Sequence, residues 1–333
     1  MNARSIRFGR AFSWVGCGLI IAGRLAAQVG PEFTAIQALT NRETALILSG
    51  ALGFSYRIDV STNFPTWFPL VTLTGATATL QHTDSAAPYL NSRLYRAEQL
   101  SATNVLTGDH LLTDDGDVVI HPIGHASFVL AWQGKMIYND PTNGAAPYQG
   151  LPRADLILVS HSHGDHFSAA TLDAVRGSNA VIIVPQAVYN SLSAAQKSLA
   201  IVLTNGASTS VTGLLVEAVP AYNFTNHPTI YHPQGLGNGY VLTLGGRRIY
   251  MSGDSEDVPE MRALPNIDVA FVCVNQPFTM PVDKAASAVR QFRPRVVYPY
   301  HYRNSDNTYS DLNDFKRRVG QDLGIEVRLR QWY

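Results

Sequence analysis

Four potential metal ligands, His161, His163, Asp165 and His166, lie within six consecutive residues. Residues at positions i and i+2 of an extended segment project to the same side, so His161 and His163 can bind one ion. The glycine that follows them allows the chain to turn and to direct Asp165 and His166 to a second ion. The chain has ten histidines, and three of them in one loop indicate a metal site rather than a solvated polar loop.

Two later apolar stretches each lead to a further potential ligand. Residues 249–251 are followed closely by Asp254, and residues 296–300 are followed by His301. Functional sites of proteins that contain sheets gather where strands end. We therefore expect both side chains to join the site formed by the His-rich loop.

The elements that must position these residues lie between 117 and 333. Short apolar stretches alternate there with stretches of helical periodicity, which predicts a mixed α/β domain of two sheet layers covered by helices. A hairpin turn is expected at Gly245 and Gly246. The longer helices are expected over residues 185–199, 282–292 and 310–323.

Residues 31–98 predict a separate small β-sandwich module. Polar and apolar residues alternate between Gly, Pro and Asn, and in the stretch 54–60 this alternation predicts a strand with one buried face. The motifs around Tyr56, Trp67 and Tyr95 resemble those of the fibronectin-III-like modules of secreted bacterial proteins. The module has no cluster of potential ligands, so we expect a spacer or an adhesion role, with contact to a surface or polymer. Residues 99–116 are expected to form the linker.

Composition limits the partners and the kind of metal site. Hydrophobic residues make up 46% and charged residues 15% of the 333 residues, which is the composition of a globular protein. A net charge of zero argues against a nucleic-acid partner and favours a small-molecule substrate. The two cysteines, Cys17 and Cys273, are too few for a disulfide scaffold or a Cys-rich zinc cluster.

Residues 1–27 predict a signal peptide. Basic residues precede the apolar run 11–22, and small residues at 25–27 supply a cleavage site. We expect the mature chain to begin near Gln28, to be secreted or periplasmic, and to have no stable membrane insertion. The alternative, an uncleaved anchor, requires about 20 uninterrupted apolar residues, whereas glycines and an arginine interrupt this run.

Residues 117–333 resemble the metallo-β-lactamase fold superfamily, an αββα sandwich with a dinuclear metal site between its sheets. The resemblance rests on the His-rich loop, on Gly-Asp at Asp254, on Pro-Tyr-His-Tyr at His301 and on Asp-Pro at Asp140. Within the superfamily, residues 124–127, 232–240 and 278–280 are most similar to the ascorbate-6-phosphate-lactonase-like branch. The implied metal ligands are His161, His163, Asp165, His166, Asp254 and His301. The resemblance also implies that Asp254 bridges two ions and that it acts in catalysis with Asp165.

One metal ligand is missing from its usual place. The branch often has a histidine after the strand that ends here at Tyr222 and Asn223, neither of which is a good zinc ligand. A catalytic zinc takes three protein ligands, so the third ligand of the first ion is expected from the following loop. We assign it to His232, because Pro233 and three nearby glycines restrict and shape the backbone after it. The alternative is His227, whose neighbours are typical of an exposed turn.

The expected activity is that of a secreted metal-dependent hydrolase. A hydroxide that bridges two divalent metal ions would attack a small ester, lactone or amide. Zinc suits the His and Asp donors best, and manganese or iron would accept the same donors. His125 is expected either as a substrate contact or proton carrier at the pocket rim, or as a hydrogen-bonded histidine at a strand end.

Two other functions use the same residues. A phosphodiesterase could use the same dinuclear site, but it ranks second because no path of Lys or Arg for a phosphate is evident near the motifs apart from Arg247 and Arg303. A non-catalytic surface-binding protein could use the metal site for structure alone. This third hypothesis is disfavoured, because a structural zinc ion needs only one closed set of four ligands and this chain offers more potential ligands than that.

Overall fold

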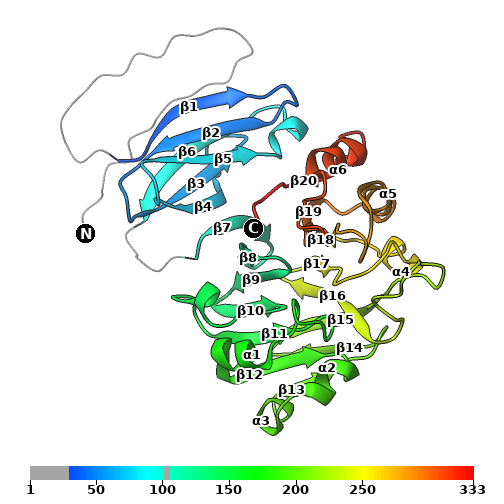
Figure 1. Ribbon diagram of the computed structural model, residues 1–333. Coiled ribbons are helices and arrows are strands. Elements are labelled where there is room, and N and C mark those ends of the chain that lie inside the picture. Colours follow the sequence, from blue (N-terminus) through cyan, green and yellow to red (C-terminus); the bar gives the residue numbers. More distant parts are fainter. Residues whose placement is uncertain (1–29, 101–105) are drawn as a thin grey trace, which may run out of the picture. The chain divides into compact units, whose positions relative to one another are not determined.

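The computed structural model describes residues 30–100 and 106–333 (Figure 1). They belong to two compact units, Met1–Leu112 and Thr113–Tyr333. The predicted signal peptide, residues 1–27, lies outside the described residues. In the part of the chain that the structure describes, no helix has both the length and the apolar character needed to cross a membrane.

The first unit is built from strands. One antiparallel sheet has the order β1-β2-β5, with β1 (Glu32–Ala38), β2 (Thr44–Ser49) and β5 (Thr79–Asp84). The other strands pair in the order β6-β3-β4-β7, with β3 (Ser55–Ser61), β4 (Phe68–Thr74), β6 (Leu94–Leu100) and β7 (Gly108–Thr113). A short 3-10 helix, η1 (Ala87–Tyr89), precedes β6. Strand β7 lies within the stretch 99–116 that the sequence predicts as a linker.

Strand β3 is covered on both faces rather than on one. Three apolar residues of the stretch 54–60 are buried as predicted, but Phe54 precedes the strand and is 44% exposed. The face predicted to be polar and solvated contains the buried Asp59, whose carboxylate pairs with Arg57 at 2.7 Å and with Arg96 at 2.8 Å. Because these arginines neutralise and cover the carboxylate, alternation alone does not reveal its burial.

Asp84, at the end of β5, is the most deeply buried carboxylate of the first unit's described residues. It accepts hydrogen bonds from Arg93 Nε at 2.6 Å, from the Tyr95 hydroxyl at 2.9 Å and from the Ala86 N–H at 3.1 Å. Burial opposes the charge on Asp84, but hydrogen bonds and the charge of Arg93 outweigh it and lower the pKa of this carboxyl. Asp84 therefore ties the turn after β5 to strand β6.

The second unit begins with a six-stranded sheet. Its order is β13-β12-β11-β10-β9-β8, with antiparallel pairing from β8 to β10 and parallel pairing from β10 to β13. The strands are β8 (Gly116–Gly124), β9 (Ser127–Trp132), β10 (Lys135–Asn139), β11 (Ala154–Leu158), β12 (Arg176–Val184) and β13 (Ala200–Val202). A 3-10 helix, η2 (Ala146–Tyr148), lies between β10 and β11.

A seven-stranded sheet follows in the order β14-β15-β16-β17-β18-β19-β20. The strands are β14 (Ser208–Val211), β15 (Leu214–Ala221), β16 (Gly237–Leu244), β17 (Arg247–Met251), β18 (Val269–Cys273), β19 (Val296–Tyr300) and β20 (Glu326–Val327). Pairing is antiparallel from β14 to β17 and parallel from there to β20. Leu244 pairs with Arg247, which confirms the hairpin predicted at the two glycines between them.

The two sheets of the second unit pack face to face through aromatic side chains. The ring of Phe128, from β9, stacks on that of Phe271, from β18, with centroids 4.2 Å apart. Trp332 packs edge-on against both rings, at 5.9 and 6.1 Å. The Tyr240 hydroxyl donates to the Val159 carbonyl at 2.8 Å and joins the sheets by a buried hydrogen bond. This arrangement confirms the predicted architecture of two sheet layers (Figure 1).

Helices accompany both sheets of the second unit (Figure 1). They are α1 (Ala169–Val175), α2 (Gln186–Ser191), α3 (Ala194–Lys197), α4 (Pro259–Arg262), α5 (Val282–Phe292) and α6 (Leu312–Val319). Helix α5 has the predicted bounds. The single helix predicted over 185–199 is wrong, because Ser193 and Gln196 form a capping box that starts a new helix. The helix predicted over 310–323 ends early, because Gly320 with φ of 70° stops it.

Replacing Asp84 with alanine is expected to destabilise the first unit by about 3 to 5 kcal/mol, because it leaves Arg93 without its buried partner. The measurement is hydrogen exchange of the β5 amides in the full chain, which reports the free energy of unfolding. The control is Glu98→Ala, since Glu98 is 58% exposed and pairs with Arg57, an interaction that contributes about 1 kcal/mol or less. Equal effects of the two substitutions would show that Asp84 is not a structural anchor.

Candidate metal centre

Six strands of the second unit direct their carboxyl ends to the site. Strands β8, β10 and β11 run in one direction within the first sheet, and β15, β17 and β19 share a direction within the second. A polar side chain follows each strand within three residues: His125, Asp140, His161, Asn223, Asp254 and His301. The sheet topology therefore brings together residues that are far apart in the sequence.

The His-rich loop is a tight turn between β11 and α1. The backbone N–H groups of His166 and Phe167 both donate to the carbonyl of His163, at 3.0 and 2.8 Å. His161 and His166 are buried, whereas the Asp165 side chain is 49% exposed. The loop thus presents two imidazoles to the interior and a carboxylate at the surface of the site.

The predicted ligands lie in three overlapping groups, and within each group one ligand atom per residue lies within 4.8 Å of the others. The groups are His161, His163 and His232; His125, Asp165, His166 and His301; and His161, His166 and Asp254. Asp254 lies between the first two groups. Its Oδ2 is 3.4 Å from Nε2 of both His232 and His301, and its Oδ1 is 3.3 Å from Nε2 of His166.

Several buried atoms of this cluster have no hydrogen-bond partner among the described residues. They are Nε2 of His161 and His166, both ring nitrogens of His232 and His301, and Oδ1 of Asp254. Buried polar groups in folded proteins are almost always hydrogen-bonded, and leaving one unpaired costs about 1 to 3 kcal/mol. Nitrogen and oxygen donors that converge in this way fit a bound divalent cation.

The charges of the cluster also favour a cation. Burial lowers the pKa of His161 well below its ordinary value, and the neighbouring His166 lowers it further. Burial opposes the charge on Asp254, but His301 and His166 outweigh it and hold the pKa of this carboxyl well below its usual range. His161 is therefore neutral and Asp254 negative at neutral pH, and these are the forms that bind a metal.

Asp140 holds His166 from behind. Its Oδ2 is 2.8 Å from His166 Nδ1 and accepts from the Ser160 hydroxyl at 2.7 Å, while its Oδ1 accepts from the Ser160 N–H at 2.6 Å. A proton on Nδ1 leaves Nε2 of His166 free to bind a metal. Burial disfavours a charged His166 ring, but the negative charges of Asp254 and Asp140 outweigh burial and raise the pKa of His166. The two carboxylates thus favour positive charge at this position. Asp140 is a site residue that was not predicted from the sequence, although it lies in an Asp-Pro motif.

His232 enters the cluster because Asn223 fixes its backbone. Asn223 Oδ1 accepts from the N–H groups of Tyr231 and His232 at 2.9 and 2.8 Å, and the Asn223 N–H donates to the His232 carbonyl at 2.8 Å. Asn223 is buried and its Nδ2 donates to the Phe278 carbonyl at 2.9 Å. By contrast, a ring nitrogen of His227 contacts the backbone of its own turn. The structure brings His232, and not His227, to the predicted ligands.

His125 is the fourth member of the second group. Its Nε2 is 2.9 Å from Asp165 Oδ2, and its ring centroid is 3.8 Å from that of His301. The other nitrogen, Nδ1, is 2.7 Å from the Tyr333 hydroxyl. Tyr333 is a site residue that sequence reasoning missed, since it lies 208 residues from its partner and belongs to no motif.

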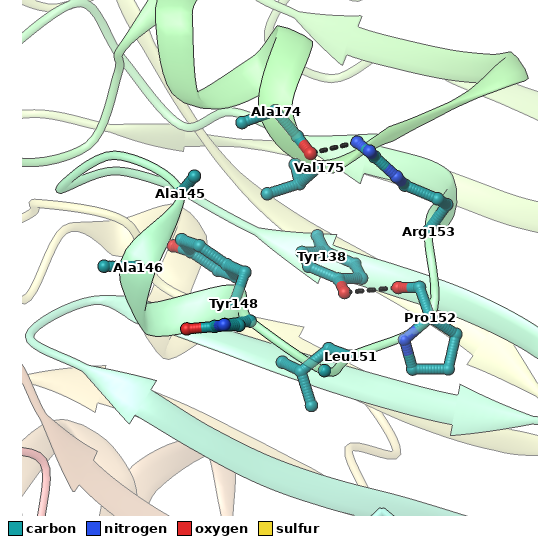
Figure 2. Close-up of a pocket in the computed structure, with 11 residues that line it drawn as sticks. Tyr138, Ala145, Ala146, Tyr148, Leu151, Pro152, Arg153, Ala174 and Val175 are labelled. Carbon is teal, nitrogen blue, oxygen red and sulfur yellow. Dashed lines mark hydrogen bonds between the residues drawn. The ribbon is translucent and has the colours of Figure 1, made fainter. Parts of the chain in front are cut away.

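Two cavities of the second unit differ in the types of residue that line them. A cavity of about 50 Å³ opens onto the first group of ligands and is lined beside them by Tyr231 and Leu236. A larger cavity of about 310 Å³ lies elsewhere, lined by Tyr138 and Arg153 among others (Figure 2). None of the described residues that line the larger cavity is His, Asp or Glu, whereas His161, His163, His232 and Asp254 line the smaller one.

A protein-family model described as a beta-lactamase superfamily domain matches residues 119–301. A UPF0173 metal-dependent hydrolase from Thermococcus kodakarensis is 34% identical over 213 residues, which cover 62% of this chain and 93% of the relative. A UPF0173 metal-dependent hydrolase from Pyrococcus horikoshii is 32% identical, with the same coverage of both chains.

Solved structures show the same fold. The crystal structure of a metal-dependent hydrolase from Parabacteroides distasonis matches with a TM-score of 0.60 and 39% identity, over 69% of this chain and 100% of that one. The metallo hydrolase Igni18 from Ignicoccus hospitalis matches in fold, with a TM-score of 0.54 and 24% identity over 64% and 95% of the two chains. Together with the converging His and Asp side chains, these matches show that the chain is a metal-dependent hydrolase that belongs to the metallo-β-lactamase superfamily and, within it, to the UPF0173 family.

Proposed function

We propose that this hydrolase cleaves a small ester, lactone or amide with the help of two divalent cations. The observation that carries the proposal is the position of Asp254 between two groups of ligands, with an oxygen 3.4 Å from a histidine of each group. A purely structural metal needs one closed set of four ligands. Two adjacent sets that share a carboxylate are instead typical of hydrolytic sites. A lactone also agrees with the resemblance of the sequence to the lactonase-like branch.

The ligands divide between the two cations. One cation would be held by His161, His163 and His232 and the other by Asp165, His166 and His301, with Asp254 shared; we leave His125, the fourth member of the second group, for proton transfer. Imidazole and carboxylate donors suit zinc, and manganese or iron accept the same set. When bound, such ions polarise the substrate carbonyl and lower the pKa of water.

The chain's own residues complete the reaction. Hydrolysis adds one water across the acyl bond, so that the hydroxyl joins the acyl carbon and a proton goes to the leaving oxygen or nitrogen. His125 is the group we assign to carry this proton, because its Nε2 faces Asp165 at 2.9 Å. Burial lowers the pKa of His125, although the hydrogen bond that its ring donates to Asp165 opposes this, so the ring is neutral at neutral pH and can accept a proton on its other nitrogen. Tyr231 and Leu236 line the cavity where the rest of the substrate would lie.

Metal analysis and turnover test this proposal directly. The zinc-loaded protein is expected to hydrolyse p-nitrophenyl esters and lactones faster than bis-p-nitrophenyl phosphate. Asp254→Ala should abolish turnover and release metal, because it removes the shared ligand. His125→Ala should lower kcat/KM by about a hundredfold with the metal retained, as expected for loss of a proton carrier. Equal losses of activity in both variants at unchanged metal content, or a preference for the phosphodiester, would contradict the proposal.

The assignment of the first cation's third ligand has its own test. His232→Ala is expected to lose the metal of the first group, whereas His227→Ala should keep the wild-type metal content. Asn223→Ala should weaken metal binding by about 10 to 100 times, the usual effect of removing a residue that orients a ligand. Metal per chain, measured after dialysis against a chelator series, distinguishes these variants. Retention in His232→Ala with loss in His227→Ala would reverse the assignment.

We also propose that the chain is exported, on the basis of the apolar run 11–22 and the small residues at 25–27. Mass spectrometry of protein recovered outside the cytoplasm is expected to give an N-terminus near Gln28. Ala27→Glu should block processing, because the cleavage site requires small residues. Exported protein that retains Met1 in the wild type would refute cleavage.

A further inference from the structure

We propose that Arg303 and Tyr333 form an anion-binding subsite beside the metal centre, and that the substrate is an ester or lactone that carries a carboxylate group. This inference rests on the proposed hydrolysis and adds the substrate class. It depends on contacts around Arg303 that the ligand assignment does not use.

Arg303 is an exposed cation close to the ligands in sequence, and its guanidinium lies against the ring of Tyr333, whose hydroxyl contacts His125. It follows His301 by two residues, and it forms no ion pair with any residue that the structure describes. By contrast, Arg262 pairs with Asp257, and Arg247 pairs with Asp268 at 3.5 Å. Of the two cations that the sequence places near the motifs, Arg303 is therefore the one left to meet a ligand.

The ring of Tyr333 lies against the guanidinium of Arg303. The Arg303 Cζ lies 5.0 Å from the ring centroid of Tyr333, a cation–π contact. Tyr302 and Tyr309 pack around the same ring, with centroids 5.0 and 5.3 Å from it. Stacking restrains the plane of a guanidinium and leaves its N–H edge free for a ligand. The cation is thus partly ordered before any anion arrives, which reduces the entropy cost of binding.

Two further contacts connect this subsite to the metal centre. The Tyr333 hydroxyl is 2.7 Å from His125 Nδ1, and the ring of His125 lies 3.8 Å from that of His301. A small molecule with its carbonyl at the ligand cluster can therefore place another group near Arg303. On the side of the first ligand group, the cavity is lined by Tyr231 and Leu236, which suit an apolar part of the substrate.

The charge of the subsite favours a carboxylate over a phosphate monoester. The planar guanidinium fork matches the two oxygens of a carboxylate, and its single positive charge balances the single negative one. A phosphate monoester carries a charge of about −1.5 to −2 at neutral pH and would be only partly neutralised by one arginine. An ester or lactone with a free carboxylate is the substrate class that these groups recognise.

A pair of esters that differ only in the end group measures this recognition. The ratio of kcat/KM for mono-p-nitrophenyl glutarate over p-nitrophenyl pentanoate is expected to fall about tenfold in Arg303→Gln, which corresponds to about 1.4 kcal/mol. Arg303→Lys should retain part of the preference because it keeps the charge. The control is Arg295→Gln, since Arg295 is also exposed, at 70%, but pairs with Asp268; it should keep the wild-type ratio.

Binding of glutarate to the zinc-loaded protein, measured by calorimetry, separates the subsite from the hydrolysis. The Kd is expected to rise about tenfold in Arg303→Gln and to be unchanged in Arg295→Gln. If neither ester is cleaved but glutarate binds in an Arg303-dependent manner, the proposed hydrolysis is wrong and the subsite stands. An unchanged ester ratio and an unchanged glutarate Kd in Arg303→Gln would overturn the subsite, as would a wild-type protein that does not bind glutarate.

Discussion

The buried carboxylate of Asp254 is surrounded by imidazoles, each with a ring nitrogen that has no hydrogen-bond partner among the described residues. A carboxylate in this position, with an unpaired oxygen next to unpaired ring nitrogens, is costly for a folded protein unless something compensates it. The surrounding structure holds these groups together despite that cost. Gly253 is an example, because its φ is 58° and an added Cβ would lie 2.8 Å from the Asn238 carbonyl oxygen. Only a glycine there allows the chain to turn Asp254 towards the histidines.

The residues that support the ligands come from both sheets and from the loops between strands. Asp140 and Ser160 hold one imidazole from the first sheet, and Asn223 holds the segment that carries another from the second. Metal sites depend on such outer contacts nearly as much as on the ligands themselves. The two packed sheets of the second unit therefore fix the orientation of the metal ligands from two sides.

The sequence revealed the parts of the site that are local or that end a strand. The His-rich loop is contiguous, and Asp254 and His301 each follow an apolar stretch, so pattern and strand ends were enough to predict their convergence. Asn223 and Tyr333 could not be assigned in this way, because their roles depend on hydrogen bonds to residues far along the chain or to backbone in an irregular loop. In the first unit, the burial of Asp59 could not be predicted for a similar reason, because it depends on arginines from two strands that cover the carboxylate.

The groups of potential metal ligands differ in how firmly their imidazoles are held. His166 is fully buried and braced through Nδ1 by Asp140. His163 is exposed, and neither ring nitrogen of His232 has a hydrogen-bond partner among the described residues. A ligand that is not braced can swing away from an ion without breaking other bonds. The two cations that we propose would consequently exchange at unequal rates, and a form loaded only at the His166 group would persist when metal is scarce.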